Sequence, residues 1–172
     1  YIEKLSEAGK KEIKNYDDLK EVLRSRIDFF SSMGSKISDH AVEYVPYIEA
    51  GDDEIDAILK KALNGEKCTD EEVEKYKTSI ITFFAKEYAK RDWVMQIHIG
   101  ALRNNNTNMF KKLGPDTGFD SIDDNKIAHK LSRFMDNLDK DGNLPKVILY
   151  SLNPNDNYTL AAMLGNFQKG GV

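Results

Sequence analysis

Hydrophobic residues recur at three- and four-residue spacing through much of the chain, the pattern of helices with one buried face. These stripes stop at Gly34, Gly65 and Gly142, and glycine commonly ends helices. Thr69 and Glu72 have the spacing of a capping box, so one helix is expected to begin there. The pattern predicts helices over residues 19–30, 55–63, 69–88, 123–138 and 157–167.

Strands are predicted between these helices, over residues 35–41, 93–102 and 146–152. The last is a compact apolar run, as buried parallel strands usually are. Each strand follows a helix, and this alternation favours a parallel sheet with right-handed crossover connections. We therefore expect an α/β fold with three parallel strands and flanking helices.

The middle strand alternates between two kinds of side chain. Trp93, Met95, Ile97 and Ile99 are expected to point one way, with Val94, Gln96 and His98 on the other face. A polar face is unusual for a sheet core, but it is natural in a (β/α)8 barrel, where functional groups project at the carboxyl ends of the strands. Asp39-His40 is predicted to end the first strand in the same way, and a polar turn over 153–157 follows the third.

Three strands cannot close such a barrel, which needs eight strands and typically about 250 residues. No internal repeat in the 172 residues supplies the others, and the length suits a single region over 1–172. The chain is thus expected to be a small open α/β domain or a helix-rich part of a larger TIM barrel.

Composition removes several classes of protein. The net charge is −4 and no basic block is present, so nucleic acid is not expected as a partner. No apolar run approaches the ~18 residues of a membrane span, and no signal peptide or initiator Met is visible, which suggests a processed start. The single cysteine, Cys68, excludes an internal disulfide and a multi-Cys zinc site and fits a reducing cytoplasm.

His40 and His98 are the candidate catalytic side chains, because each is predicted near the carboxyl end of a parallel strand. Asp39 is the third candidate, since it could orient His40 or act as an acid or base. A hydrogen-bonded structural histidine is the alternative at both histidine positions. His129 lies outside the apolar stripe of its helix and is interpreted as a surface residue. The sequence contains no His-x-His pair or paired cysteines with metal-ligand spacing.

Arg103 and Asn104 are the candidate substrate-binding residues. They open a polar loop, Arg103–Asn106, directly after the middle strand. Arginine binds carboxylates through a bidentate fork and asparagine can bind hydroxyl groups, a combination that suits a sugar acid. A solvated loop is the alternative, because asparagine is common in turns. The glycines that follow, over 114–118, match no phosphate-binding motif.

Long runs of the sequence closely resemble the glucuronate (uronate) isomerase family of the amidohydrolase superfamily. The runs that carry the resemblance are Ser38–Ala41, His98–Asn106, Leu113–Ser121, Leu144–Pro154 and Gly165–Gln168. The resemblance covers nearly the whole chain, and HIGALRNNN is far more specific than a short motif. It implies a (β/α)8 TIM barrel in which this chain supplies about the fourth to sixth strands.

The resemblance also implies a reaction, the reversible aldose–ketose isomerisation of D-glucuronate to D-fructuronate and of D-galacturonate to D-tagaturonate in hexuronate catabolism. It matches Asp39 and His98 to active-site positions of the family. The family binds a divalent metal, commonly zinc, through a His-x-His pair on the first strand and an Asp on the last, and this chain has neither. We therefore expect a cytoplasmic enzyme. This chain alone is expected neither to bind the metal nor to be active.

Two alternatives to the isomerase remain open. The chain could be an autonomous, non-catalytic α/β module that binds sugar acids. It could also be an oligomerisation module, because open sheet edges invite strand pairing with a second copy.

Overall fold

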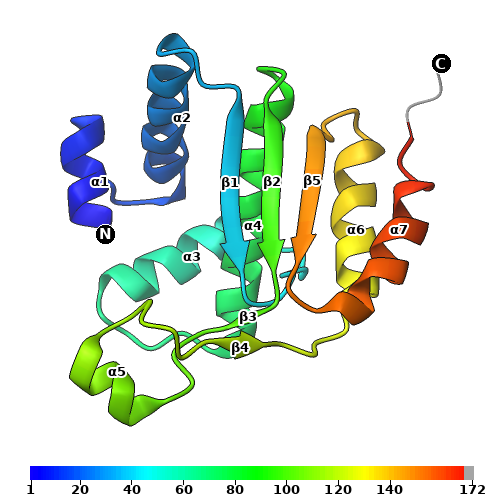
Figure 1. Cartoon of the computed structure of the whole chain (residues 1–172). Helices are drawn as coiled ribbons and strands as arrows, with labels where there is room; N and C mark the ends of the chain where they lie inside the picture. The colour runs from blue at the N-terminus through cyan, green and yellow to red at the C-terminus, as the bar shows by residue number, and fades with distance from the viewer. Residues whose placement is uncertain (169–172) are drawn as a thin grey trace.

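The computed structural model describes residues 1–168 (Figure 1). In chain order its elements are α1 (Ile2–Gly9), α2 (Tyr16–Ser32), β1 (Ile37–Val42), α3 (Asp52–Leu63), α4 (Asp70–Ala89), β2 (Val94–Ile99), β3 (Ala101–Leu102), α5 (Thr107–Leu113), β4 (Ser121–Ile122), α6 (Ala128–Asp139), β5 (Lys146–Ser151), the 3-10 turn η1 (Pro154–Asp156) and α7 (Asn157–Leu164). Every predicted helix and strand has a counterpart among these elements, while the short helices α1 and α5 were not predicted.

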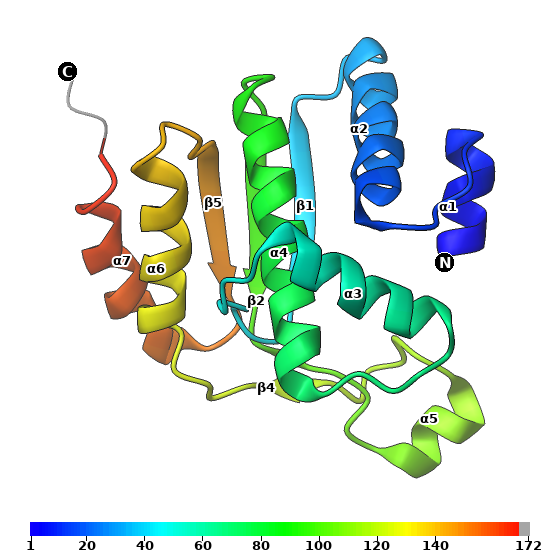
Figure 2. The ribbon, with the colours of Figure 1, turned by 180° about the vertical axis from the view of Figure 1, so that it is seen from behind.

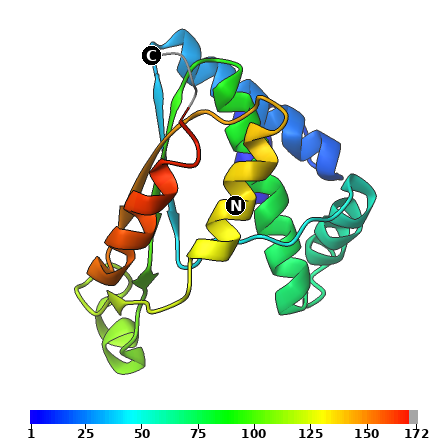
Figure 3. The ribbon, with the colours of Figure 1, turned by 90° about the vertical axis from the view of Figure 1, so that its right-hand side faces the viewer.

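The main sheet has the order β1-β2-β5, and both strand pairs are parallel. This confirms the predicted α/β class with three parallel strands. Helices α4 and α6 lie behind the sheet in Figure 1, and the side view in Figure 3 shows them as a layer on one side of it. Apolar residues of β2 pack against these helices, with Met95 0% and Ile97 2% exposed. The sheet therefore has one face buried beneath helices.

A second hydrophobic core joins α1, α2, α3 and α4 at one side of the sheet, as seen from behind in Figure 2. Leu19 and Val22 of α2 meet Ile55 and Ile58 of α3 there, and Phe83 of α4 joins them. Helix α4 contributes residues to both cores, so it connects the helical cluster to the core beneath the sheet.

Local sequence chemistry explains where the helices begin and end. The predicted capping box is present: the Glu72 backbone N–H donates to Thr69 Oγ1 at 3.2 Å, and the Thr69 N–H donates to Glu72 Oε2 at 2.6 Å. Gly34 and Gly142 have φ of +93° and +68°, a region that glycine occupies without strain. The Asn15 side chain caps α2 by accepting from the Asp18 N–H.

Several predicted boundaries differ from the structure: the first strand begins at Ile37, the first predicted helix covers Tyr16–Ser32, and the last ends at Leu164. Three further differences bear on the site. The strand predicted over 93–102 breaks at Gly100, where φ is +89°, and Ala101–Leu102 then pairs antiparallel with β4. The helix predicted from residue 123 begins at Ala128, because the Asp123 N–H donates to the Gly100 carbonyl instead. The first strand continues to Val42, so Asp39-His40 lies inside it and not at its end.

Among residues 1–168, every helix is too short or too polar to span a bilayer.

Candidate functional site

One face of the sheet carries exposed side chains of mixed character, and we call it the open face. Strand alternation and the parallel register place it opposite the buried Met95 and Ile97. Exposed apolar residues lie beside polar ones, with Ile37 54% and Tyr150 42% exposed. Its members are Ile37, Asp39, Ala41, Val94, Gln96, His98, Lys146, Ile148 and Tyr150.

Asp39 and His98 meet on the open face. His98 Nε2 lies 2.9 Å from Asp39 Oδ1, and the two side chains are 47% and 65% exposed. This is an ion-pair contact, and because an ionised carboxylate can only accept hydrogen bonds, it favours a proton on Nε2. In the neutral imidazole this assigns the proton to Nε2 and leaves Nδ1 as an acceptor. The pair therefore presents a carboxylate oxygen and a basic ring nitrogen at the open face.

His40 lies on the opposite, helix-covered face. Its Nε2 is 3.1 Å from the Tyr88 hydroxyl, and its ring centroid is 5.3 Å from that of Phe84. Burial lowers the pKa of His40, and the nearby Asp39 carboxylate offsets this only in part. The structure thus separates His40 from Asp39 and His98, and its contacts match the structural alternative.

Tyr150 was not singled out in the sequence, although it neighbours His98 directly. The two residues are partners in the register of β2 and β5. Their rings are stacked, with centroids 4.5 Å apart and planes 10° apart. The predicted strand over 146–152 and the predicted place of His98 could have pointed to Tyr150, because side chains on the same face of adjacent parallel strands lie side by side.

Arg103 and Asn104 lie in the loop that follows β3, beyond the carboxyl ends of the strands (Figure 1). Arg103 Nη1 lies 2.9 Å from Asp120 Oδ2 and 3.4 Å from Asp116 Oδ1. The backbone N–H of Asn104, at φ +55°, donates to Asp120 Oδ1 at 2.8 Å. Asp120 therefore holds both residues, and these contacts leave the Nε and Nη2 edge of Arg103 available for a bidentate anion.

A second polar cluster follows β5 and was predicted only as a turn. Asn153 is 6% exposed, and its Nδ2 donates to the Asp123 carbonyl at 3.3 Å and to Asp124 Oδ1 at 3.2 Å. Ser151 Oγ donates to Asp156 Oδ2 at 2.7 Å. These bonds tie the loop after β5 to the loop before α6, and so they fix the rim of the sheet at its carboxyl end.

The donor set of the described residues does not suit the divalent metal that the family resemblance implies. Within residues 1–168, no three His, Cys, Asp or Glu side chains gather closely enough to hold an ion. Asp39 and His98 supply two groups, and a zinc site takes at least three protein ligands. These two residues alone therefore do not make up a zinc site.

Comparisons with known proteins agree on one family. The sequence model of the glucuronate isomerase family matches residues 1–172. The uronate isomerase of Clostridium acetobutylicum is 52% identical over 168 residues, which are 98% of this chain and 36% of that protein. The uronate isomerase of Caldicellulosiruptor saccharolyticus is 53% identical over 172 residues, all of this chain and 37% of that protein.

Solved structures give the same result. The Thermotoga maritima uronate isomerase matches with a TM-score of 0.91 and 32% identity, over 97% of this chain and 37% of that one. The Caulobacter crescentus glucuronate isomerase matches with a TM-score of 0.81 and 26% identity, over 90% of this chain and 32% of that one. The chain spans 32–37% of the length of these four relatives. Its whole sequence matches the family, and its fold matches solved members, so this chain belongs to the glucuronate isomerase family.

Proposed function

We propose that this chain is a central part of a uronate isomerase that interconverts aldose and ketose hexuronates. The whole-chain match to the family supports the reaction class. D-glucuronate and D-galacturonate are the proposed substrates, with D-fructuronate and D-tagaturonate as products. The enzyme would act in hexuronate catabolism in the cytoplasm, as a (β/α)8 barrel of the amidohydrolase superfamily in which β1, β2 and β5 are about the fourth to sixth strands.

The Asp39–His98 pair is the single observation that carries the site. Aldose–ketose isomerisation moves a proton from C2 to C1 through an enediol, with a second proton moving between the two oxygens. His98 Nδ1 faces away from the Asp39 contact at Nε2, and as an unprotonated ring nitrogen it can accept a proton from the sugar. Asp39 would then stabilise the imidazolium, as a carboxylate does when it orients a basic histidine. His40 would contribute only through the stability of β1.

Arg103 and Asn104 are proposed to bind the substrate. The Nε and Nη2 edge of Arg103 suits the uronate carboxylate, because two parallel N–H groups fit a carboxylate bidentately. The Asn104 side chain can bond a sugar hydroxyl. The divalent metal, commonly zinc, would be held by family residues that this chain lacks, so the isolated chain is expected to be inactive.

Substitution of His98 in the full-length gene product tests this assignment. His98→Ala and Asp39→Asn are expected to lower kcat by about 10²–10⁴-fold, the usual contribution of a positioned acid–base group. His129→Ala, at an exposed position of α6, is the matched control and should turn over normally. Circular dichroism should show the same fold in all variants. Wild-type turnover in a folded His98→Ala variant would remove the pair from the site.

A further inference from the structure

The imidazole of His98 is contacted from two directions by two different strands. Asp39, on β1, meets the ring edge at Nε2 at a distance of 2.9 Å. Tyr150, on β5, covers a ring face with centroids 4.5 Å apart and planes 10° apart. His98 lies between them on β2, the central strand. Tyr150 is the register partner of His98, whereas Asp39 pairs with Gln96 and reaches His98 diagonally, so both contacts come from strands and neither from a loop.

The two contacts restrain different motions of the ring. A histidine side chain has a broad preference about its outer torsion angle, so an exposed ring can turn easily. The ion-pair contact at Nε2 restrains the position of one nitrogen but still permits rotation about the Nε2–Oδ1 line. A parallel aromatic ring fixes the plane, because offset stacking favours a narrow range of tilts. Only the two contacts together fix where Nδ1 points.

Packing from other residues does not replace this stacking contact. The His98 side chain is 47% exposed, in contrast to its β2 neighbours Ile97 and Ile99, which are 2% and 1% exposed. The plane of an exposed ring depends on its few direct contacts. Tyr150 is thus the contact that decides the plane of His98.

We propose that Tyr150 is a positioning residue, whose aromatic ring holds the His98 imidazole so that Nδ1 faces the substrate. The proposal rests on the function proposed above for His98. It assigns the effect to the ring and not to the hydroxyl group, because stacking needs only the aromatic face. Tyr150 acts through His98 and does not itself exchange a proton with the sugar.

Kinetics of the full-length protein test the proposal. Tyr150→Leu is expected to lower kcat by up to about tenfold with KM changed less than about twofold, since an aromatic contact of this type is worth up to such a factor. Tyr150→Phe keeps the ring and should stay within about twofold of wild type. Tyr158→Leu is the matched control, because Tyr158 is 89% exposed on α7. Tyr150→Met is a second ring-free variant if the leucine variant does not fold.

A double substitution separates positioning from general damage. In a His98→Ala background, Tyr150→Leu should cause no further loss of kcat, because the residue through which Tyr150 acts is already gone. An equal loss in both backgrounds would overturn the proposal. A kcat loss in Tyr150→Phe as large as that in Tyr150→Leu would also overturn it, since the hydroxyl would then carry the effect.

A spectroscopic readout distinguishes this proposal from the proposed function. The NMR signals of the His98 ring protons should shift in Tyr150→Leu, because the ring current of Tyr150 is lost, and should stay unchanged in Tyr158→Leu. Unchanged His98 signals in Tyr150→Leu would contradict the positioning role. If His98→Ala retains wild-type turnover, the proposed function fails, while these signals still report whether Tyr150 sets the ring plane.

Discussion

Neighbouring residues on β1 illustrate how strongly position within a strand decides chemistry. Asp39 and His40 are adjacent, and the sequence motif invites treating them as one unit. Successive side chains of a strand point to opposite faces, so Asp39 reaches His98 while His40 reaches Tyr88 beneath the helices. The same alternation rule correctly placed His98 opposite Ile97. Applied to β1, the rule assigns Asp39 and His40 to opposite faces in the same way, so only one of them can belong to the open face.

The protonation of His40 should be visible in the stability of the fold. Its pKa is lowered by burial, so the folded state binds fewer protons than the unfolded state in the interval below the unfolded value of about 6.5. The contribution of neutral His40 to the free energy of unfolding is therefore fully present above about pH 6.5. It declines as the pH falls from there through the folded pKa. His40→Gln should flatten this part of the curve of unfolding free energy against pH, measured by urea denaturation from pH 7.5 to 5. An unchanged slope in the variant would show that His40 is not the titrating group.

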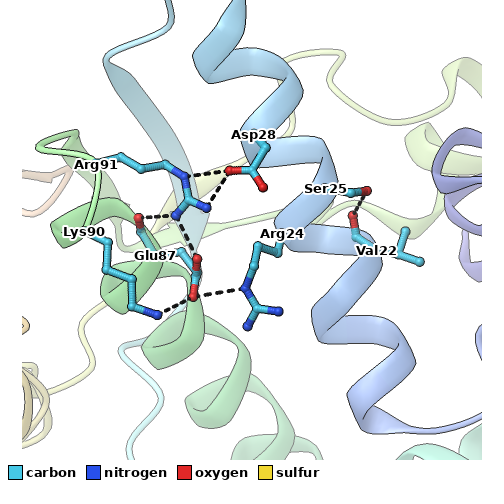
Figure 4. Close-up of polar contacts among 7 residues, drawn as sticks. All are labelled: Val22, Arg24, Ser25, Asp28, Glu87, Lys90 and Arg91. Atoms are coloured by element: carbon cyan, nitrogen blue, oxygen red, sulfur yellow. Dashed lines mark hydrogen bonds and ion pairs between the residues drawn. The ribbon is translucent and has the colours of Figure 1, made fainter.

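At the scale of elements, an ion network joins α2 to the end of α4 (Figure 4). The Glu87 side chain is 3% exposed. Its Oε1 lies 2.8 Å from Lys90 Nζ and 3.4 Å from Arg24 Nε, and its Oε2 lies 2.7 Å from Arg91 Nη1. Arg91 also bridges to Asp28 of α2 at 2.6 Å. Burial pushes the pKa of Glu87 upward, but the hydrogen bonds from Lys90 and Arg91 outweigh it and leave the pKa below its ordinary value.

Glu87→Gln should lower the free energy of unfolding by about 1–3 kcal/mol, because a nearly buried, hydrogen-bonded charge is lost. The three cations stay partly exposed to water, which limits the loss. The lowered pKa has a second consequence: the contribution of Glu87 is present above its unfolded pKa and is lost as the pH falls through the folded value. Thermal denaturation at pH 7 measures the loss, with Glu71→Gln, an exposed position of the same helix, as control. Equal melting temperatures for Glu87→Gln and wild type would contradict this role.

Much of the element pattern was predictable because it is local. Apolar stripes, glycine stops and the Thr69–Glu72 box depend on residues within a few positions, and the corresponding helices are present. The β3–β4 pair was not predictable, because each strand has two residues and forms only through a contact between distant segments. The site divides in the same way. Sequence indicated His98 and Asp39, whereas their 2.9 Å contact and the Asp120 clamp on Arg103 depend on tertiary structure.

At the scale of the whole molecule, the main sheet of the described residues ends at β1 on one side and β5 on the other. Unpaired strand edges and exposed apolar side chains favour association. Ile37 and Ile148 on the open face are 54% and 41% exposed, and Leu152, directly after β5, is 55% exposed. The isolated 172 residues should therefore be marginally stable or self-associate with rising concentration, as sedimentation velocity would show. A monodisperse monomer that melts cooperatively would count strongly against an incomplete barrel.

These residues belong to the glucuronate isomerase family, and we propose that they do not by themselves complete an isomerase site. The most direct measurement is an isomerase assay with D-glucuronate and added zinc, run side by side on the 172 residues and on the full-length gene product. We expect turnover in the longer protein alone. Turnover by the 172 residues would contradict this proposal, because Asp39, His98 and Arg103 would then suffice without the metal ligands proposed for the rest of the protein.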